Sequence, residues 1–470
     1  MRENPYEPPR SCAKFQELII MSLSLSRRQL CGAAIASILP SSLNSKEIEK
    51  PPKILKASAD AFQFKGSMKT DAFSFNSLFP GPLLRFSQGD QMDIKLVNGL
   101  NLPLTLHWHG MRGDNAMDGV APLTQNAVLA DQDFSYRRTL VEPGLFCYRP
   151  SVYGYTPELM GRGLKGLLIV DELDPLPCDL DLAIVLDSLL IDINHKISED
   201  FGHQTSINSS EPSNAILTVN GKIAPLIHSA PPGGRVRLRL ANLSNAQIMI
   251  VCFTGMKPFV IAIDSQPCTA FEPVRGSIPM APGARFELMF DMPVDPTSKA
   301  TVTLFGSERG DQDIIALKCQ GSPISQNKPI ASLPLNKALP AEIKLDNSKK
   351  VDLTLAMNKD HGKRAWRING KQTEGYSGAP LFKVKAGAPV TLGFINQAPL
   401  PVAMHVHGHA VRLLHDKDDG WEPYWRNGVI VPPLKTKHVA FIANAPGKWA
   451  LHDDILENEA SGLATWFLVE

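Results

Sequence analysis

Three segments of this 470-residue chain repeat one pattern, and the repeat restricts the possible folds more than any other feature. Each copy starts with an apolar stretch that contains proline, passes through a glycine turn, and ends in an alternating strand-like run that closes on asparagine. The copies occupy residues 81–98, 224–242 and 379–396. Their final residues, Asn98, Asn242 and Asn396, lie about 150 residues apart, which is the size of one β-sandwich domain. The repeat therefore predicts three consecutive β domains.

The repeat and the composition between its copies indicate the domain boundaries. We expect domain 1 at residues 46–175, domain 2 at 176–322, a linker rich in Ser, Pro, Asn and Lys at 323–345, and domain 3 at 346–470. The 38 prolines and 34 glycines, spread between short apolar runs, favour β-sandwiches over helical domains. A formal net charge of +1 provides no attraction to nucleic acid or to an anionic membrane, so we expect neither as a partner.

Residues 1–45 carry a predicted export signal. Residues 26–30 (SRRQL) precede an uncharged run from Cys31 to Pro40, which is the pattern of a twin-arginine signal peptide. The run is too short to span a bilayer, and no later segment is long and apolar enough to do so. We therefore expect a periplasmic protein without a transmembrane segment in the mature chain. The alternative is an uncleaved N-terminal tail, and the sequence leaves the start open between Met1 and Met21.

Five cysteines would remain in the exported chain. They form no Cys-x-x-Cys motif, and the oxidising periplasm would allow one disulfide whose partners the sequence does not identify. We expect most of them to act as small buried apolar residues. They are Cys147, Cys178, Cys252, Cys268 and Cys319.

Two histidine motifs at opposite ends of the mature chain predict a metal site. Residues 107–110 read HWHG and residues 405–409 read HVHGH, whereas domain 2 contains no such motif. Because residues two apart in a strand share a face, each His-x-His can aim two imidazoles at one point. Residues 446–454 (PGKWALHDD) also match residues 143–151 (PGLFCYRPS), so that His452 aligns with Arg149. The pattern indicates a metal site built from two distant segments.

These motifs, together with residues 115–125 (NAMDGVAPLTQ) and 161–170 (GRGLKGLLIV), resemble those of the multicopper oxidases. The resemblance covers nearly the whole mature chain. It implies an all-β fold of three consecutive cupredoxin-like Greek-key β-sandwich domains. In an active member of that family, a mononuclear copper held by two histidines and a cysteine takes electrons from the substrate. A trinuclear cluster held by eight histidines, between domains 1 and 3, reduces dioxygen.

Carried over position by position, the resemblance implies a partial trinuclear cluster. Five of its eight positions are histidine: His107, His109, His405, His407 and His452. By the same resemblance, His107 and His405 would hold the lone cluster copper, and His407 and His452 one copper of the coupled pair. We expect His409, outside this set, to bind nearby backbone instead of metal.

The other three cluster positions hold Arg149, Ser151 and Asp454, of which Asp454 is the one possible ligand. Arg149 is a permanent cation without a lone pair, so it opposes a metal, and we expect it to pair with Asp454 or with Asp453. Asp118 corresponds to the acid that assists proton delivery beside the family's cluster. Its alternative role is that of a turn cap.

The positions of the mononuclear site hold none of the family's ligands. Val402 and Asn458 occupy the positions of its two histidines, Asp453 occupies that of its cysteine, and Leu463 occupies that of its axial methionine. Because none of these side chains binds copper as a blue site does, we expect a copper-binding protein and not a working four-copper oxidase. Zinc is the alternative ion. Two further alternatives are a metal-free scaffold with a protein partner in the cell envelope and an active laccase-type oxidoreductase.

Overall fold

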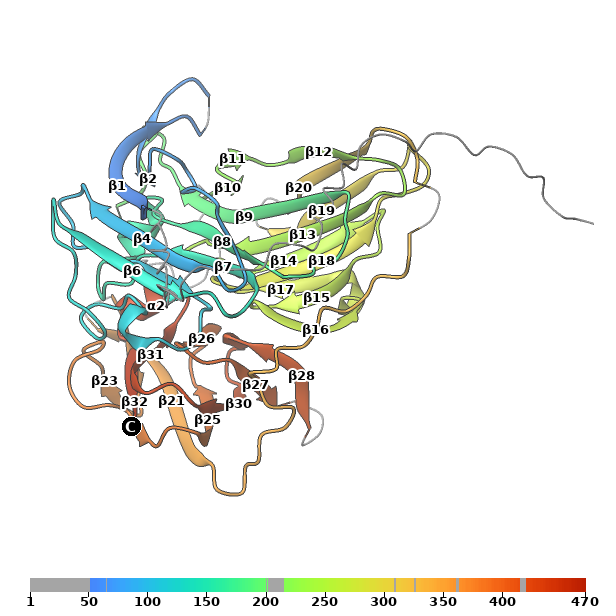
Figure 1. Ribbon diagram of the computed structural model, residues 1–470. Coiled ribbons are helices and arrows are strands. Elements are labelled where there is room, and N and C mark those ends of the chain that lie inside the picture. Colours follow the sequence, from blue (N-terminus) through green and yellow to red (C-terminus); the bar gives the residue numbers. More distant parts are fainter. Residues whose placement is uncertain are drawn as a thin grey trace, which may run out of the picture. The chain divides into compact units, whose positions relative to one another are not determined.

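The computed structural model describes residues 51–64, 66–199, 201, 215–307, 310–324, 327–360, 363–414 and 420–470. These residues form three pairs of β-sheets in chain order (Figure 1), which confirms the predicted all-β fold of three consecutive cupredoxin-like sandwiches. The predicted export signal in residues 1–45 lies outside the described residues. Within the described ranges, no helix has the length and apolar character needed to span a membrane.

Domain 1 consists of a sheet in the order β2-β1-β4-β6 and a sheet in the order β3-β8-β7-β5. The first contains β1 (Lys53–Phe62), β2 (Thr70–Phe75), β4 (Gln91–Asn98) and β6 (Asp133–Thr139). The second contains β3 (Leu84–Ser87), β5 (His107–His109), β7 (Gly144–Arg149) and β8 (Gly166–Asp171). Two short helices, η1 (Asn115–Met117) and α1 (Thr156–Gly161), lie in its connections.

Domain 2 pairs a sheet in the order β11-β10-β9-β13-β18-β15-β16 with a sheet in the order β12-β20-β19-β14-β17. The first contains β9 (Leu180–Leu190), β10 (Ala215–Val219), β11 (Lys222–Ile223), β13 (Arg235–Asn242), β15 (Phe259–Ile263), β16 (Gln266–Phe271) and β18 (Arg285–Asp291). The second contains β12 (Leu226–Ala230), β14 (Met249–Thr254), β17 (Ser277–Met280), β19 (Ala300–Ser307) and β20 (Gly310–Cys319), and the short helix η2 (Val274–Gly276) precedes β17.

Domain 3 repeats this plan with sheets in the orders β23-β22-β21-β25-β30-β27-β28 and β24-β32-β31-β26-β29. The first contains β21 (Lys349–Asp360), β22 (Lys363–Ile368), β23 (Lys371–Gln372), β25 (Ala388–Asn396), β27 (Val411–Leu414), β28 (Trp421–Arg426) and β30 (Thr436–Ala443). The second contains β24 (Lys383–Val384), β26 (Val402–Val406), β29 (Gly428–Val431), β31 (Gly447–Asp453) and β32 (Ala464–Val469). The helix α2 (Leu456–Ala460) joins its last two strands.

The asparagine that ends each sequence repeat has the same structural role in all three domains. Asn98 is buried, and its side-chain Nδ2 donates to the carbonyls of Leu102 and Val128 while its Oδ1 accepts from the N–H of Leu100. Asn242 and Asn396 make the same three kinds of hydrogen bond. A buried asparagine here satisfies backbone groups that a turning chain would otherwise leave unpaired. The repeat therefore marks the turn after one central strand of each sandwich.

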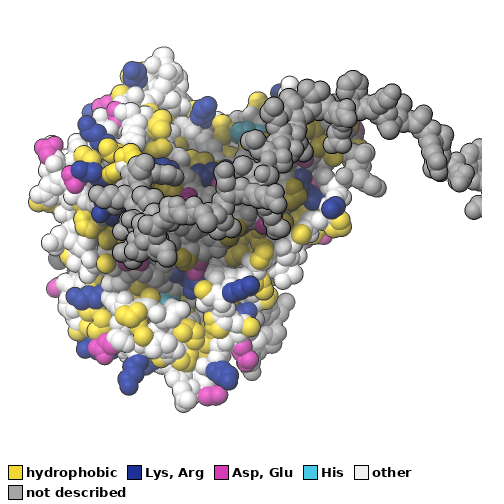
Figure 2. Space-filling view, in the orientation of Figure 1, with side chains coloured by type: hydrophobic (Ala, Val, Ile, Leu, Met, Phe, Trp, Pro, Cys, Tyr) yellow, Lys and Arg dark blue, Asp and Glu magenta, His cyan; other side chains and the backbone are white. Residues whose placement is uncertain are grey.

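Each sandwich is closed by a dense apolar interior, in which Trp366 and Trp449 of domain 3 are completely buried. The five cysteines of the described ranges are free thiols, and only Cys147 and Cys268 are buried, fewer than we expected. On the face drawn in Figure 2, basic and acidic side chains are interspersed among uncharged ones.

Candidate metal centre

One strand of domain 1 carries His107 and His109, and two strands of domain 3, with the turn after the first of them, carry the other three histidines. His107 and His109 form the ends of the short strand β5, whose partner β7 places Arg149 directly opposite His107. In domain 3, β26 and β31 are antiparallel, and they place His452 directly opposite His405. His107, His109, His405, His407 and His452 are each at most 2% exposed. Strand pairing within each domain thus places the His-x-His motif next to the segment that holds Arg149 in domain 1 and His452 in domain 3.

The five histidines converge on one buried region between domains 1 and 3. The ring centroids of His107 and His407 are 4.2 Å apart, and those of His109 and His405 are also 4.2 Å apart. The His407 ring lies 4.9 Å from the His452 ring. A metal site with several histidine ligands requires imidazole rings this close together, and here the rings come from opposite ends of the chain.

His107 and His405, which we call the first histidine pair, each have one ring nitrogen held by a backbone carbonyl. Nδ1 of His107 donates to the carbonyl of Asp118 at 2.8 Å, and Nδ1 of His405 donates to that of Asn427 at 2.9 Å. Because a carbonyl can only accept, Nδ1 carries the proton in each ring, and Nε2 has a lone pair whenever the ring is neutral. Both Nε2 atoms are buried and have no hydrogen-bond partner among the described residues. Burial, together with the neighbouring histidines, holds the pKa of His405 well below its ordinary value, so the ring is neutral.

His407 and His452, the second histidine pair, face one another through Nε2 atoms only 2.8 Å apart. Nδ1 of His452 donates to the carbonyl of Asp453 at 2.9 Å, and Nδ1 of His407 donates to Oδ2 of Asp118 at 3.0 Å. Burial and the nearby His107 lower the pKa of His407 to about 4. Both Nε2 atoms therefore carry lone pairs at neutral pH, and a cation between them, either a proton or a metal ion, would remove the repulsion of the short contact.

Asp118 orients both histidine pairs. Its carbonyl holds His107, and its carboxylate accepts from His407 while lying 3.3 Å from Nδ1 of His107. Burial alone would raise the pKa of this carboxyl, but His407 and His107 more than offset it and the pKa is lowered. Asp118 also caps the short helix η1, where its backbone N–H donates to the carbonyl of Asn115. Its ionised side chain lies where it can fix the tautomers of two rings.

An ion pair stands where the family's remaining cluster ligands would be. Nη2 of Arg149 donates to Oδ1 of Asp454 at 2.5 Å, and both side chains are buried. Of the two partners that we expected for Arg149, Asp454 is therefore the one that the structure has. The same Nη2 lies 3.3 Å from Nδ1 of His109, which must accept, so the proton of that ring is on Nε2. In this tautomer the Nδ1 lone pair of His109 faces Arg149, although His107, His109 and His405 lie close enough together to hold one ion. Ser151 is buried, and its backbone is bound to Thr105.

The residues at the mononuclear positions form a closed hydrogen-bond network. Oδ1 of Asp453 accepts from the N–H groups of Ala403 and Ile455, at 2.8 and 2.9 Å, and Oδ2 accepts from Nδ2 of Asn458 at 2.8 Å. Oδ1 of Asn458 in turn accepts from the Trp366 indole. Val402 and Leu463 are fully buried. Burial raises the pKa of Asp453 to about 7, and its carboxyl accepts three hydrogen bonds from the protein.

His409 has the structural position that we expected. Its Nδ1 contacts the carbonyl of His407 at 2.8 Å, and its ring packs against Phe441 and Trp449. It therefore braces the turn that follows β26 and does not face the other five histidines.

Several residues of domain 2 that border the site carry no sequence signal. Gly283 lies so close that a Cβ placed on it would be 2.7 Å from Nε2 of His109 and 3.0 Å from Oδ2 of Asp454. Beside it is a cavity of about 40 Å³ between segments 279–284 and 426–430, which has room for a few water molecules. Asp264 and Arg285 lie at the same border and contact Asn427. Only the three-dimensional docking of domain 2 brings these residues to the histidines.

Comparisons with known proteins agree with this architecture. Two family models described as multicopper oxidase match residues 56–174 and residues 342–470. The multicopper oxidase MmcO of Mycobacterium tuberculosis is 25% identical over 434 residues, which cover 85% of this chain and 83% of that protein. Among solved structures, a multicopper oxidase from Pseudomonas thermotolerans superimposes with a TM-score of 0.80 at 24% identity, covering 89% of this chain and 99% of its own. Lac15 from a marine microbial metagenome superimposes with a TM-score of 0.73 at 26% identity, covering 89% and 100%.

The class that the fold and the paired histidine strands define is thus a three-domain cupredoxin protein with a buried histidine centre. This chain belongs to the multicopper oxidase family.

Proposed function

We propose that this member of the family binds copper at its two histidine pairs and is not a four-copper oxidase. The observation that carries the proposal is the set of four inward-facing Nε2 lone pairs. Those of His107 and His405 are buried without a partner, and those of His407 and His452 meet at 2.8 Å. A buried polar atom without a hydrogen bond is costly, and a bound cation would satisfy all four.

The geometry of the second histidine pair is compatible with a metal ion. Two nitrogens bound to one metal at about 2.0 Å and about 90° to each other, as in a square-planar copper site, are about 2.8 Å apart. The Nε2 atoms of His407 and His452 are separated by 2.8 Å, which is also the length of a hydrogen bond through one shared proton. Their other ring nitrogens donate to protein acceptors, as those of metal-binding histidines do. Imidazole suits copper and zinc, and a given nitrogen site binds Cu²⁺ more tightly than Zn²⁺. Copper is therefore the first candidate and zinc the second.

Two features argue against the complete oxidase circuit. The Arg149–Asp454 ion pair brings a permanent positive charge to the cluster and takes the lone pair of His109. The Asp453 carboxyl, which already accepts three hydrogen bonds, is a hard ligand with no thiolate path for an electron. A laccase-type activity would need an electron entry site that these residues do not form.

Metal analysis of the purified protein tests the proposal. We expect one or two tightly bound copper ions per chain after loading and no blue absorbance. His405→Ala should remove the ion at the first pair, and His452→Ala the ion at the second. His438→Ala is the matched control, because His438 lies on β30 of the same domain and outside the cluster.

A protein that stays free of copper and zinc, with a thermal midpoint unchanged by added metal, would contradict the proposal. That result would favour the metal-free scaffold, in which the Arg149–Asp454 pair compensates for the absent metal charge. Blue colour with oxygen uptake from a phenolic donor would instead favour an active oxidase.

We further propose that the protein is exported to the periplasm by the twin-arginine route, on the strength of residues 26–40. Replacing Arg27 and Arg28 by lysine should retain the protein in the cytoplasm. Equal periplasmic yield from the native and the altered signal would contradict this proposal.

A further inference from the structure

Domain 2 contains none of the five clustered histidines, yet it holds the residue that orients one of them. The carbonyl of Asn427 accepts from Nδ1 of His405. The backbone N–H of Asn427 donates to Oδ2 of Asp264 at 3.0 Å, and its side-chain Oδ1 accepts from Nη2 of Arg285 at 2.5 Å. Both partners belong to domain 2, so Asn427 is held there at its backbone and at its side chain.

Arg285 contacts all three domains through one buried guanidinium. Its Nε donates to the carbonyl of Leu145 in domain 1 at 3.1 Å, and its Nη1 to the carbonyl of Gly283 in domain 2. Its Nη2 reaches Asn427 of domain 3 and lies 2.3 Å from where a Cβ on Gly110 would be. Only a planar group with several fixed donors can satisfy such widely separated acceptors.

The turn that presents Asp264 is itself built for this contact. Asp264 and Ser265 join β15 to β16 with φ angles of 48° and 70°, in the left-handed region that costs a non-glycine residue energy. Both side chains are engaged across domain boundaries: Asp264 binds Asn427, and Ser265 donates to the carbonyl of Leu145. A turn that keeps these side chains instead of glycine is consistent with a positioning role.

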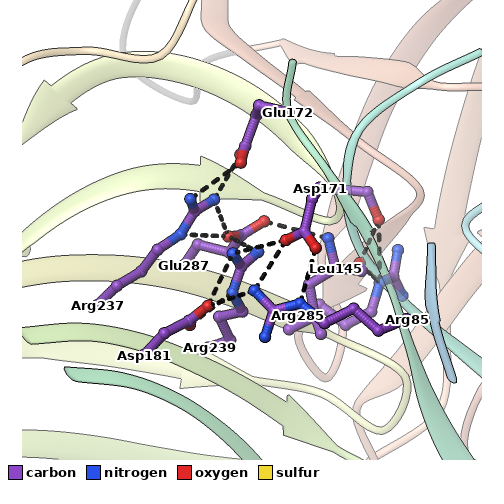
Figure 3. Close-up of polar contacts among 10 residues, drawn as sticks. Arg85, Leu145, Asp171, Glu172, Asp181, Arg237, Arg239, Arg285 and Glu287 are labelled. Atoms are coloured by element: carbon purple, nitrogen blue, oxygen red, sulfur yellow. Dashed lines mark hydrogen bonds and ion pairs between the residues drawn. The ribbon is translucent and has the colours of Figure 1, made fainter. Parts of the chain in front are cut away.

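A network of charged residues in domain 2 binds the backbone N–H of Leu145, whose carbonyl is bound by Arg285 and Ser265 (Figure 3). Glu287 accepts from the Leu145 N–H at 3.1 Å and from Arg237 and Arg239. Arg239 also pairs with Asp181, and the described ion pairs of Arg239 are all with residues of domains 1 and 2. Both polar groups of the Leu145 backbone are therefore bound by domain 2, four residues before Arg149 on the same strand.

We propose that Arg285, with Asp264, is a positioning residue for the metal centre. The two side chains hold Asn427, Asn427 holds His405 in the Nδ1–H tautomer, and the Nε2 lone pair is thereby directed into the cluster. This inference deepens the proposed function and rests on it for the metal, but the tautomer of His405 belongs to the metal-free protein and can be measured without copper.

The test compares four substitutions in the otherwise native chain. Arg285→Lys and Asn427→Ala each remove the contact between the two side chains. Asn427→Asp keeps an acceptor for Arg285 and is the expected rescue. Arg239→Lys is the matched control, because it alters a buried arginine of the same charge network that does not reach Asn427.

The first measurement is nitrogen-15 spectroscopy of the metal-free protein with labelled histidine, the His405 signals being assigned by their loss in His405→Gln. We expect a single Nδ1–H tautomer in the native protein, Asn427→Asp and Arg239→Lys, and mixed or exchanging signals in Arg285→Lys and Asn427→Ala. The second is copper affinity by competition with a chelator. Changing such an outer partner of a ligand weakens metal binding about 10- to 100-fold, and we expect this loss in the same two variants.

Unchanged His405 signals in both Arg285→Lys and Asn427→Ala would overturn the inference. So would a loss of affinity in Arg239→Lys as large as that in Arg285→Lys, because the effect would then follow general stability. If the native protein binds no metal, the proposed function fails, whereas the tautomer measurement still decides whether domain 2 positions His405.

Discussion

Removal of one member of the Arg149–Asp454 pair is expected to destabilise the protein strongly. The two groups are 2.5 Å apart, and their side chains are only 3% and 5% exposed. Breaking a buried ion pair by removing one partner costs about 3–5 kcal/mol, because the other charge stays buried without compensation. An exposed pair would cost about 0.2–1 kcal/mol. We therefore expect a loss of about 3–5 kcal/mol for Arg149→Met at pH 7.

The cost of the single substitution has a limit that can be seen in the structure. Burial raises the pKa of Asp454 to about 6 even with Arg149 beside it. Without Arg149 the carboxyl is expected to take up a proton at pH 7, which caps the penalty of an isolated charge. Replacing both partners by apolar residues, Arg149→Met with Asp454→Leu, should therefore recover most of the stability lost in the single variant.

The assay is denaturant unfolding of the native protein, the two single variants and the double variant. Their free energies of unfolding are comparable provided that the four proteins have the same m-value. The coupling energy of the cycle isolates the pair from the other contacts of each residue. A cost below about 1 kcal/mol for each single variant would refute the reasoning, since it is the value of a solvated pair.

Three further predictions concern other parts of the protein. Gly283 has a φ of +80°, and a Cβ on it would press against a ring nitrogen of His109, so Gly283→Ala should lower the thermal midpoint of unfolding. Calorimetry would measure this change, and an unchanged midpoint would contradict the packing described at Gly283. Asp453→Cys alone should give no blue absorbance, whereas adding Val402→His and Asn458→His should produce it on copper loading; colour in the single variant would contradict our account of this site. Burial alone would raise the pKa of Glu287, but two arginines more than offset burial, and the pKa lies below 4.5. The ionised carboxylate therefore stabilises the fold above pH 4.5, and this stabilisation is lost as the pH falls through the lowered pKa. Glu287→Gln should therefore flatten the acid limb of the stability curve, and an unaltered acid limb would contradict the prediction.

The fold was predictable because its signals are local. The repeat that ends in Asn98, Asn242 and Asn396 reflects one buried side chain with the same three hydrogen bonds in each domain. The sequence also predicted that the five histidines lie close together, because two His-x-His motifs and the aligned segment at 446–454 carry them. Their occupancy by metal stays a prediction.

The contacts that tune the centre could not be predicted in the same way. Nothing in the sequence near Arg285 or Asp264 marks either residue, because their partner Asn427 is more than a hundred residues away and belongs to another domain. The choice of Asp454 over Asp453 as partner of Arg149 also depends on side-chain direction at the end of β31, where Asp453 is the last strand residue and Asp454 follows it. Such residues become visible only when the domains are docked.

The central claim is that metal binds at the two histidine pairs and nowhere else in the former copper centres. Anomalous diffraction at the copper edge, from crystals grown with copper, tests it most directly. We expect peaks between His107 and His405 and beside the Nε2 atoms of His407 and His452, with none at Arg149–Asp454 and none at Asp453. A peak at Asp453, or a featureless map around all four histidines, would contradict the claim.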